Sequence, residues 1–280
     1  MNKLQRCVLG LYSYDDRAED LSLENILNQS INLIASMPTM MVNAYQMKRR
    51  YYDKQSMFFH LPKPGQSTAE HILSTYRPDQ KFTHEEAKLL DMCLLVHADH
   101  GGGNCSTFTT RVLSSSGTDT YAAISAAIGA LKGPKHGGAN LKVMHQLDYI
   151  LANVEHPEDD GEVREMLRKI IRKEAGDGSG LIYGMGHAVY TLSDPRAQIL
   201  KNHARSLAYK KGYDEEYNML CSIERLAPEI FAEEKHGPKK VCANVDLFSG
   251  LIYNMLGISE DLYTPLFAIA RVPGGCAHRV

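Results

Sequence analysis

The spacing of apolar residues is helical along nearly the whole chain, and this spacing limits the possible folds more than any other feature. Met144, Leu147 and Leu151 recur at intervals of three and four residues, so they fall on one face of a helix. The segments 163–171 and 220–230 repeat this spacing. Alternation of apolar and polar residues over strand lengths is not found, and runs rich in Val, Ile and Thr between turns are missing. The sequence therefore predicts an almost all-α protein.

Signals for helix ends support this prediction. The segments 67–70 and 83–86 have the capping-box pattern, in which Ser or Thr is followed three residues later by Glu. Asp194 and Pro195 suit the cap and the first position of another helix. Gly212 follows a helical segment rich in lysine, as glycines at helix C-termini do.

Composition is that of a globular protein, with 44% apolar and 23% charged residues among 280. This length suits one large domain or two of ordinary size. The net charge of −2 gives no general attraction to nucleic acid or an anionic membrane, so we expect neither as a partner. An anionic ligand must instead be held by a few local Arg and His side chains.

Cysteine usage and hydropathy favour a reduced, cytoplasmic protein. Six cysteines are scattered without a CxxC pair, which argues against zinc ribbons and thioredoxin-type sites. No secretory signal is visible, and the longest apolar stretch, 121–131, is too short to cross a bilayer. Small residues fill 122–131, so this helix should be buried on several sides, in the core or in a subunit interface.

The first of four chemically interesting segments is HADHGGGN, residues 97–104. His97 and His100 are three residues apart, which places them on one helix face if the helix continues, where they are able to bind a metal. A third ligand is not apparent, so a core histidine satisfied by hydrogen bonds is the commoner outcome and we expect no metal. The three glycines indicate that backbone or a ligand approaches closely.

The second segment is GPKHGGAN, residues 133–140. We expect Asn140 to cap the following helix, which puts His136 just before a helix N-terminus. The positive end of the helix dipole disfavours the imidazolium, so His136 is predicted to be neutral and able to donate one N–H to a carbonyl. A glycine-rich turn with an incidental histidine is the equal alternative.

The third segment is GMGHAVYTLSDPR, residues 184–196, which contains His187. It lacks the third glycine of a dinucleotide loop and the GK[ST] of a P-loop. Arg196 falls in the first turn of its helix, where it adds a carboxylate donor to a helix end that favours anions. A solvated surface arginine is the alternative.

The fourth segment, residues 243–250, contains Asp246 just before an apolar helix. On position alone, we interpret Asp246 as the N-cap of that helix.

Together, HADHGGGN, GPKHGGAN, GMGHAVYTLSDPR and NVDLFSG occur in an order that resembles the citrate synthase family. The second and third segments are highly specific. The resemblance runs from about residue 1 to residue 280 and is weakest before residue 80. It implies an all-α homodimer in which residues 1–137 and 246–280 form a large domain and 138–245 a small one, with the active site in the cleft between them. The alanine-rich helix would lie in the dimer interface.

The resemblance also implies residue roles in the condensation of acetyl-CoA with oxaloacetate. His136 would hydrogen-bond the thioester carbonyl, Asp246 would remove a methyl proton, and His187 would polarise the ketone of oxaloacetate. Three further residues would hold oxaloacetate: His100, Arg196 and Arg271. No cofactor or metal is implied, because acetyl-CoA is itself a substrate.

The chain departs from the family pattern in several places. Family members are longer at both ends, and nothing here matches a C-terminal arginine that reaches into the partner's site. Gly275 stands where many members have Trp, and Gly101 replaces a more usual Glu. Losing one charged donor should cost about 2–5 kcal/mol of binding, so we expect the chain as given to bind oxaloacetate weakly and to turn over slowly.

Alternatives to citrate synthase activity remain open. A 2-methylcitrate synthase would use propionyl-CoA with the same residues, because one methyl group changes pocket fit by only about 1–3 kcal/mol. A non-catalytic, truncated homologue would fold and bind without turnover. A metal protein built on His97 and His100 is the third possibility.

Overall fold

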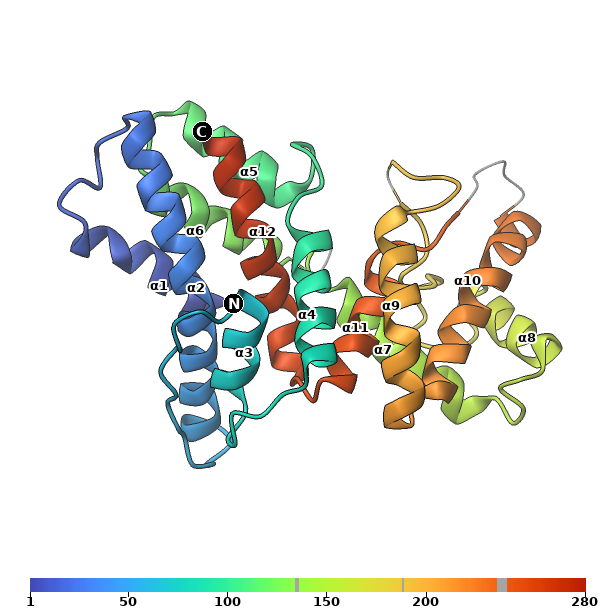
Figure 1. Cartoon of the computed structure of the whole chain (residues 1–280). Coiled ribbons are helices and arrows are strands. Elements are labelled where there is room, and N and C mark those ends of the chain that lie inside the picture. Colours follow the sequence, from blue (N-terminus) through green and yellow to red (C-terminus); the bar gives the residue numbers. More distant parts are fainter. Residues whose placement is uncertain (134–135, 188, 236–240) are drawn as a thin grey trace. The chain divides into compact units, whose positions relative to one another are not determined.

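The computed structural model describes residues 1–133, 136–187, 189–235 and 241–280 (Figure 1). These residues form α-helices joined by turns and loops and contain no strand beyond one isolated bridge. The predicted all-α fold is confirmed. The helices are α1 (Asn2–Gly10), α2 (Leu23–Tyr51), α3 (Thr68–Tyr76), α4 (His84–His97), α5 (Cys105–Ser115), α6 (Thr120–Leu131), α7 (Ala139–Asn153), α8 (Asp160–Ile171), α9 (Pro195–Lys211), α10 (Asp214–Lys235), α11 (Asp246–Met255) and α12 (Tyr263–Arg279), with 3₁₀ turns η1 (Leu11–Tyr14) and η2 (Glu260–Leu262).

The predicted helix-end signals are confirmed in the structure. Ser67 and Thr83 form complete capping boxes with the glutamates three residues later, at the starts of α3 and α4. The Asp194 side chain accepts a hydrogen bond from the N–H of Arg196 and caps α9, with Pro195 at its first position. Gly212 ends α9 in the left-handed conformation, with φ of 73°.

The chain forms two compact units, residues 1–138 with 261–280, and residues 139–260. We call them unit 1 and unit 2. The predicted limits of the smaller domain, 138–245, differ from unit 2 at the C-terminal end. The reason is that α11 packs on α7 and α9, so it lies with the helices of unit 2.

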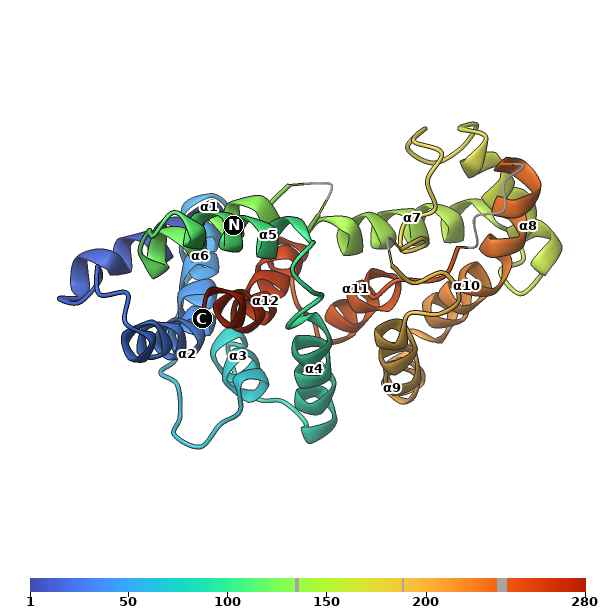
Figure 2. The ribbon, with the colours of Figure 1, turned by 90° about the horizontal axis from the view of Figure 1, so that it is seen from above.

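Unit 1 is built around α12. This helix contacts α2, α4, α5 and α6, and Figure 2 shows it lying among them. The alanine-rich helix α6 is part of this core, because Ala123, Ile124 and Ile128 are almost fully buried. Small side chains on α6 allow α1, α5 and α12 to pack against it.

Unit 2 combines α7 to α11. Helices α8 and α10 pack side by side. The ion pairs that join them include Asp160–Arg225, Arg164–Glu229, Arg168–Glu233 and Arg172–Glu234. The segment 172–194 between α8 and α9 is mostly irregular and includes one half of the isolated β-bridge between Met185 and Ala243.

Among the described helices, none is both long enough and apolar enough to cross a bilayer.

Candidate functional site

His136 lies in the turn after α6, where its backbone N–H donates to the carbonyl oxygen of Gly133 at 2.9 Å. Its ring faces the start of α5, which Asn104 caps. The Nε2 atom lies 2.9 Å from the Ser106 hydroxyl and 3.3 Å from the Ser106 backbone nitrogen. The Ser106 hydroxyl also lies 2.9 Å from Asn104 Oδ1, so its single proton has two possible acceptors.

The backbone N–H of Ser106 decides the tautomer of His136. The peptide plane fixes the direction of this hydrogen, and an N–H group only donates. The Nε2 atom of His136 is therefore an acceptor, and we assign the proton of the neutral ring to Nδ1. In this tautomer Nδ1–H is available to donate to a carbonyl oxygen.

The pKa of His136 is lowered from 6.5 to about 4, first by burial and then by the positive charge of Arg271. The ring is therefore neutral near pH 7. The neutral state was predicted from the dipole of the next helix, and the prediction that Asn140 caps that helix is wrong. Helix α7 begins at Ala139, so Asn140 lies inside its first turn, where its side chain accepts from the N–H of Leu141.

Arg271 lies in α12 and is almost fully buried. Its Nε donates to the carbonyl oxygen of His97 at 2.7 Å, and its guanidinium lies 4.9 Å from the centre of the Phe267 ring. The same ring contacts the His136 and His97 rings edge to face. Phe267 thus contacts both the Arg271 cation and the His136 ring within unit 1.

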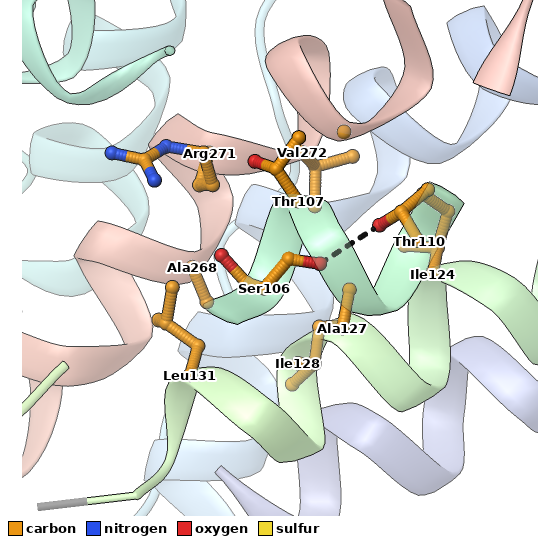
Figure 3. A pocket seen from close by; sticks show the side chains of 11 residues that line it. Ser106, Thr107, Thr110, Ile124, Ala127, Ile128, Leu131, Ala268, Arg271 and Val272 are labelled. Atoms are coloured by element: carbon orange, nitrogen blue, oxygen red, sulfur yellow. Dashed lines mark hydrogen bonds between the residues drawn. The ribbon is translucent and has the colours of Figure 1, made fainter. Parts of the chain in front are cut away.

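A small apolar cavity of about 20 Å³ lies beside these residues, between α5, α6 and α12. Figure 3 shows Ser106 and Thr107 on one wall and Ile124, Ala127 and Ile128 on another, with the Arg271 guanidinium extending away from the isoleucines. A cavity of this size holds about one water molecule. It is a packing gap behind Ser106 rather than a substrate pocket.

The histidine pair of the first segment does not share a helix face. Helix α4 ends at His97, so His100 lies beyond it in the loop, and that premise of the metal hypothesis is wrong. His97 is fully buried, and its Nδ1 lies 2.7 Å from the carbonyl oxygen of Cys93, one helical turn earlier. In the part of the chain that the structure describes, no three potential metal ligands cluster. His100 is half-buried in unit 1.

His187 lies in unit 2, in the loop before α9. Its Nδ1 accepts hydrogen bonds from the backbone N–H groups of Val189 and Tyr190, at 2.9 and 2.8 Å. We therefore assign the proton of the neutral ring to Nε2. Burial lowers the pKa of His187, and the nearby Arg196 acts in the same direction while Asp194 opposes it.

Arg196 is paired rather than solvated, so the alternative of a surface arginine is wrong. Its Nε and Nη2 donate to the two carboxylate oxygens of Asp194, at 3.0 and 2.7 Å. Asp194 is fully buried, and the Arg196 side chain is only 13% exposed. The Nη2 atom also lies 3.2 Å from Nε2 of His187. A guanidinium only donates, so with the proton of His187 on Nε2 this contact is a close approach of two donors rather than a hydrogen bond. Asp194 thus fixes the guanidinium beside the imidazole.

Asp246 is the first residue of α11 rather than its cap, so the N-cap interpretation is wrong by one residue. The cap position is Val245, which provides no side-chain hydrogen bond. The N–H of Asp246 donates instead to Oδ1 of Asn244 at 3.0 Å. The Asp246 side chain is half-buried.

The segments that carry His187 and Asp246 are hydrogen-bonded to each other within unit 2. Gly186 N–H donates to Cys242 O at 2.7 Å, and Asn244 N–H donates to Gly184 O at 2.8 Å. The Asn244 side chain adds a bond from Nδ2 to Gly186 O at 2.9 Å. Gly184 has φ of +78°, and a Cβ there would lie 2.9 Å from Cα of Leu247, so only glycine fits.

The structure therefore arranges the six predicted site residues in two groups. His136, Arg271 and His100 belong to unit 1, and His187, Arg196 and Asp246 belong to unit 2. Sequence reasoning missed Ser106, Asp194 as a partner of Arg196, and Asn244. Two of them precede a predicted site residue by two positions, Asp194 before Arg196 and Asn244 before Asp246. A hydrogen-bonding side chain at this spacing was the signal in the sequence that could have identified them.

The fold and these side chains define an all-α protein equipped with neutral imidazole donors, a carboxylate and fixed arginines, a set suited to acid–base chemistry on an anionic carbonyl compound. The family model "Citrate synthase, C-terminal domain" matches residues 1–280. The chain belongs to the citrate synthase family.

Known proteins agree with this assignment. A citrate synthase of Synechocystis sp. is 40% identical over 270 residues, which cover 96% of this chain and 61% of that protein. One from Deinococcus radiodurans is 36% identical over 277 residues, or 99% and 67% of the two chains. A solved citrate synthase from Thermoplasma acidophilum, in ternary complex with carboxymethyl coenzyme A and oxaloacetate, matches with a TM-score of 0.81 and 30% identity, covering 99% of this chain and 67% of that one. The chain thus spans between three fifths and about two thirds of the length of these relatives.

Proposed function

We propose that this protein condenses acetyl-CoA with oxaloacetate and releases citrate and CoA. The observation that carries the proposal is the protonation pattern of the two histidines. Backbone N–H groups occupy one nitrogen of each ring, Nε2 of His136 and Nδ1 of His187. Each neutral ring then keeps one N–H donor, and the reaction needs two such donors, one for each carbonyl oxygen.

The first step forms the enol of acetyl-CoA. The Asp246 carboxylate takes a proton from the methyl group while Nδ1–H of His136 hydrogen-bonds the thioester oxygen. A carboxylate alone is a weak base for this proton, so stabilising the developing charge on oxygen is essential. The pKa of His136, about 4, keeps the ring a neutral donor at physiological pH.

The second step joins the substrates. As the enol carbon attacks the ketone carbon of oxaloacetate, Nε2–H of His187 gives its proton to the ketone oxygen, which becomes the hydroxyl group of citryl-CoA. The proton that Asp246 took from the methyl group then replaces the one lost by His187, by way of the solvent. Water then cleaves the thioester, so citrate and CoA leave. Arg196, Arg271 and His100 are proposed to hold the oxaloacetate carboxylates, and the contacts of Arg196 with Asp194 use Nε and Nη2, so Nη1 is the nitrogen that we propose for the substrate. No metal or redox cofactor enters these steps.

A thiol-release assay on the purified protein tests the proposal. CoA should appear only when acetyl-CoA and oxaloacetate are both present, with citrate identified by mass spectrometry. Asp246→Ala should abolish turnover while circular dichroism and oxaloacetate binding are retained. Asp91→Asn, an exposed aspartate of α4, is the matched control and should keep full activity. Absence of CoA release from the folded protein with any acyl-CoA would contradict an enzymatic role.

The same assay with propionyl-CoA decides the acyl preference. A higher kcat/KM for propionyl-CoA would assign a 2-methylcitrate synthase instead, because the proposed proton transfers are the same for both substrates.

We also propose a cytoplasmic homodimer. On α5, Phe108 and Val112 are one helical turn apart and largely exposed. Exposed apolar side chains of this kind support a surface on unit 1 that contacts a second copy of the chain. Light scattering after size exclusion should give twice the mass of the chain. A monomer at micromolar concentration would contradict the dimer.

A further inference from the structure

The side-chain amide of Asn244 bonds to two peptide groups that directly precede candidate catalytic residues. Its Nδ2 donates at 2.9 Å to the carbonyl of the peptide bond between Gly186 and His187. Its Oδ1 accepts at 3.0 Å from the N–H of the peptide bond between Val245 and Asp246. One planar amide thus links the backbone at both residues, although they are far apart in the chain.

The surrounding backbone makes this link rigid. Residues 184–186 and 242–244 form a short antiparallel bridge with two hydrogen bonds, and the Asn244 side chain adds a third bond at the end nearest His187. Gly184 packs without room for a side chain against Leu247 in the first turn of α11. The loop of His187 is therefore held against the start of the helix that carries Asp246.

We propose that Asn244 is a positioning residue that sets the distance and orientation between the Asp246 carboxylate and the His187 imidazole. The inference rests on the proposed function, in which Asp246 makes the enol and His187 activates the ketone that the enol attacks. The two groups must act on adjacent reacting carbons, and an error of about 1 Å in such a site costs about 100-fold in rate. Asparagine suits this role because it supplies one donor and one acceptor in a single plane.

Gln146 provides a matched comparison within unit 2. Its side-chain amide also bonds two backbone groups, donating to Leu181 O and accepting from Tyr183 N–H, both at 2.9 Å. Gln146 therefore fastens the same loop to α7, but four or more residues before His187 and without a bond to the Asp246 segment. Alanine at position 146 or at position 244 would therefore remove two hydrogen bonds. Only the replacement of Asn244 would also remove the link between the two catalytic groups.

The test compares Asn244→Ala, Asn244→Asp and Gln146→Ala by steady-state kinetics, thermal unfolding and amide hydrogen exchange. Asn244→Ala should lower kcat about 100-fold and change the KM for oxaloacetate less than about threefold, because Arg196 stays paired with Asp194. Asn244→Asp keeps the acceptor for Asp246 N–H but loses the donor to Gly186, so kcat should also fall. Gln146→Ala should keep kcat within about threefold while its melting temperature falls as much as that of Asn244→Ala.

Amide exchange separates failure of this inference from failure of the proposed function. In Asn244→Ala, amide exchange should accelerate both at Asp246 and in residues 186–190. In Gln146→Ala, it should accelerate at the amide of Tyr183 instead. This exchange pattern would support the link through Asn244 even if the unaltered protein released no CoA. Absence of CoA release would refute only the proposed function. Equal kcat losses in Asn244→Ala and Gln146→Ala, or unchanged exchange at Asp246 in Asn244→Ala, would overturn the positioning role.

Discussion

The guanidinium of Arg196 is held between the Asp194 carboxylate and the imidazole of His187. Two of its nitrogens donate to Asp194, and one of these lies 3.2 Å from Nε2 of His187. Asp194 is fully buried and also caps α9, so the start of this helix fixes the position of the Arg196 guanidinium next to His187. Burial is the main cause that lowers the pKa of His187, and the cation adds to it while Asp194 opposes it, so His187 stays a neutral donor.

Asp194→Asn should therefore impair oxaloacetate binding as well as stability. The amide keeps an acceptor for the cap but removes the charge that fixes Arg196, so the KM for oxaloacetate should rise at least about tenfold. Loss of this largely buried pair should also lower the free energy of unfolding by about 1–3 kcal/mol. Kinetics and urea unfolding measure the two effects. Asp159→Asn, at the cap of α8, is the control and should leave KM unchanged. An unaltered KM in Asp194→Asn would show that Arg196 does not bind this substrate.

Replacements of Ser106 separate the two groups that contact His136 Nε2. Ser106→Ala removes the hydroxyl but keeps the backbone N–H, so the tautomer persists and kcat should fall less than about tenfold, the effect of one neutral hydrogen bond. Ser106→Pro also removes the N–H, in the first turn of α5, where proline is tolerated. It should lower kcat much further, with the helix content unchanged by circular dichroism. Equal losses in the two variants would refute assignment of the tautomer by the backbone.

The extent to which sequence predicts this molecule depends on the range of the interactions involved. Apolar periodicity and caps are local, and the capping boxes at Ser67 and Thr83 and the glycine end of α9 are found where the pattern places them. Helix ends are less certain by one or two residues. That uncertainty was enough to misplace Asp246 as a cap, whereas His100 lies three residues beyond the end of the helix that carries His97.

Contacts between distant segments were beyond the sequence pattern. Ser106 reaches His136 across 30 residues, and Asn244 reaches Gly186 across 58. Neither periodicity nor composition specifies such pairs, because they depend on how α5 and α11 pack. The resemblance to a family supplied the candidate reacting side chains, whereas the groups that contact them or their segments had to come from the structure.

Two adjacent glycines of α12 should respond in opposite ways to alanine. A Cβ on Gly275 would lie 3.6 Å from both Ile124 and Thr110, which is ordinary contact beside the small cavity. Gly275→Ala should therefore raise the free energy of unfolding by about 0.5–1 kcal/mol, since alanine favours the helix. A Cβ on Gly274 would lie only 2.2 Å from the carbonyl oxygen of Ala98, so Gly274→Ala should lower stability by about 1–3 kcal/mol. Urea unfolding measures both, and a stabilised Gly274→Ala would contradict this packing.

Protonation of His136 should make stability fall between about pH 6.5 and pH 4. The pKa is 6.5 for an ordinary histidine and about 4 in the folded protein, so in this interval the unfolded chain binds the proton and the folded chain does not. Folding is thus opposed increasingly as the pH falls through this window, and the effect is absent above it. His187 contributes in the same direction, because its pKa is also lowered.

Urea unfolding across this range should show a shallower pH dependence in His136→Asn than in the unaltered protein. His156→Asn replaces an exposed histidine and should keep the original slope. The same slope in all three proteins would mean that His136 accepts a proton as readily when folded as when unfolded.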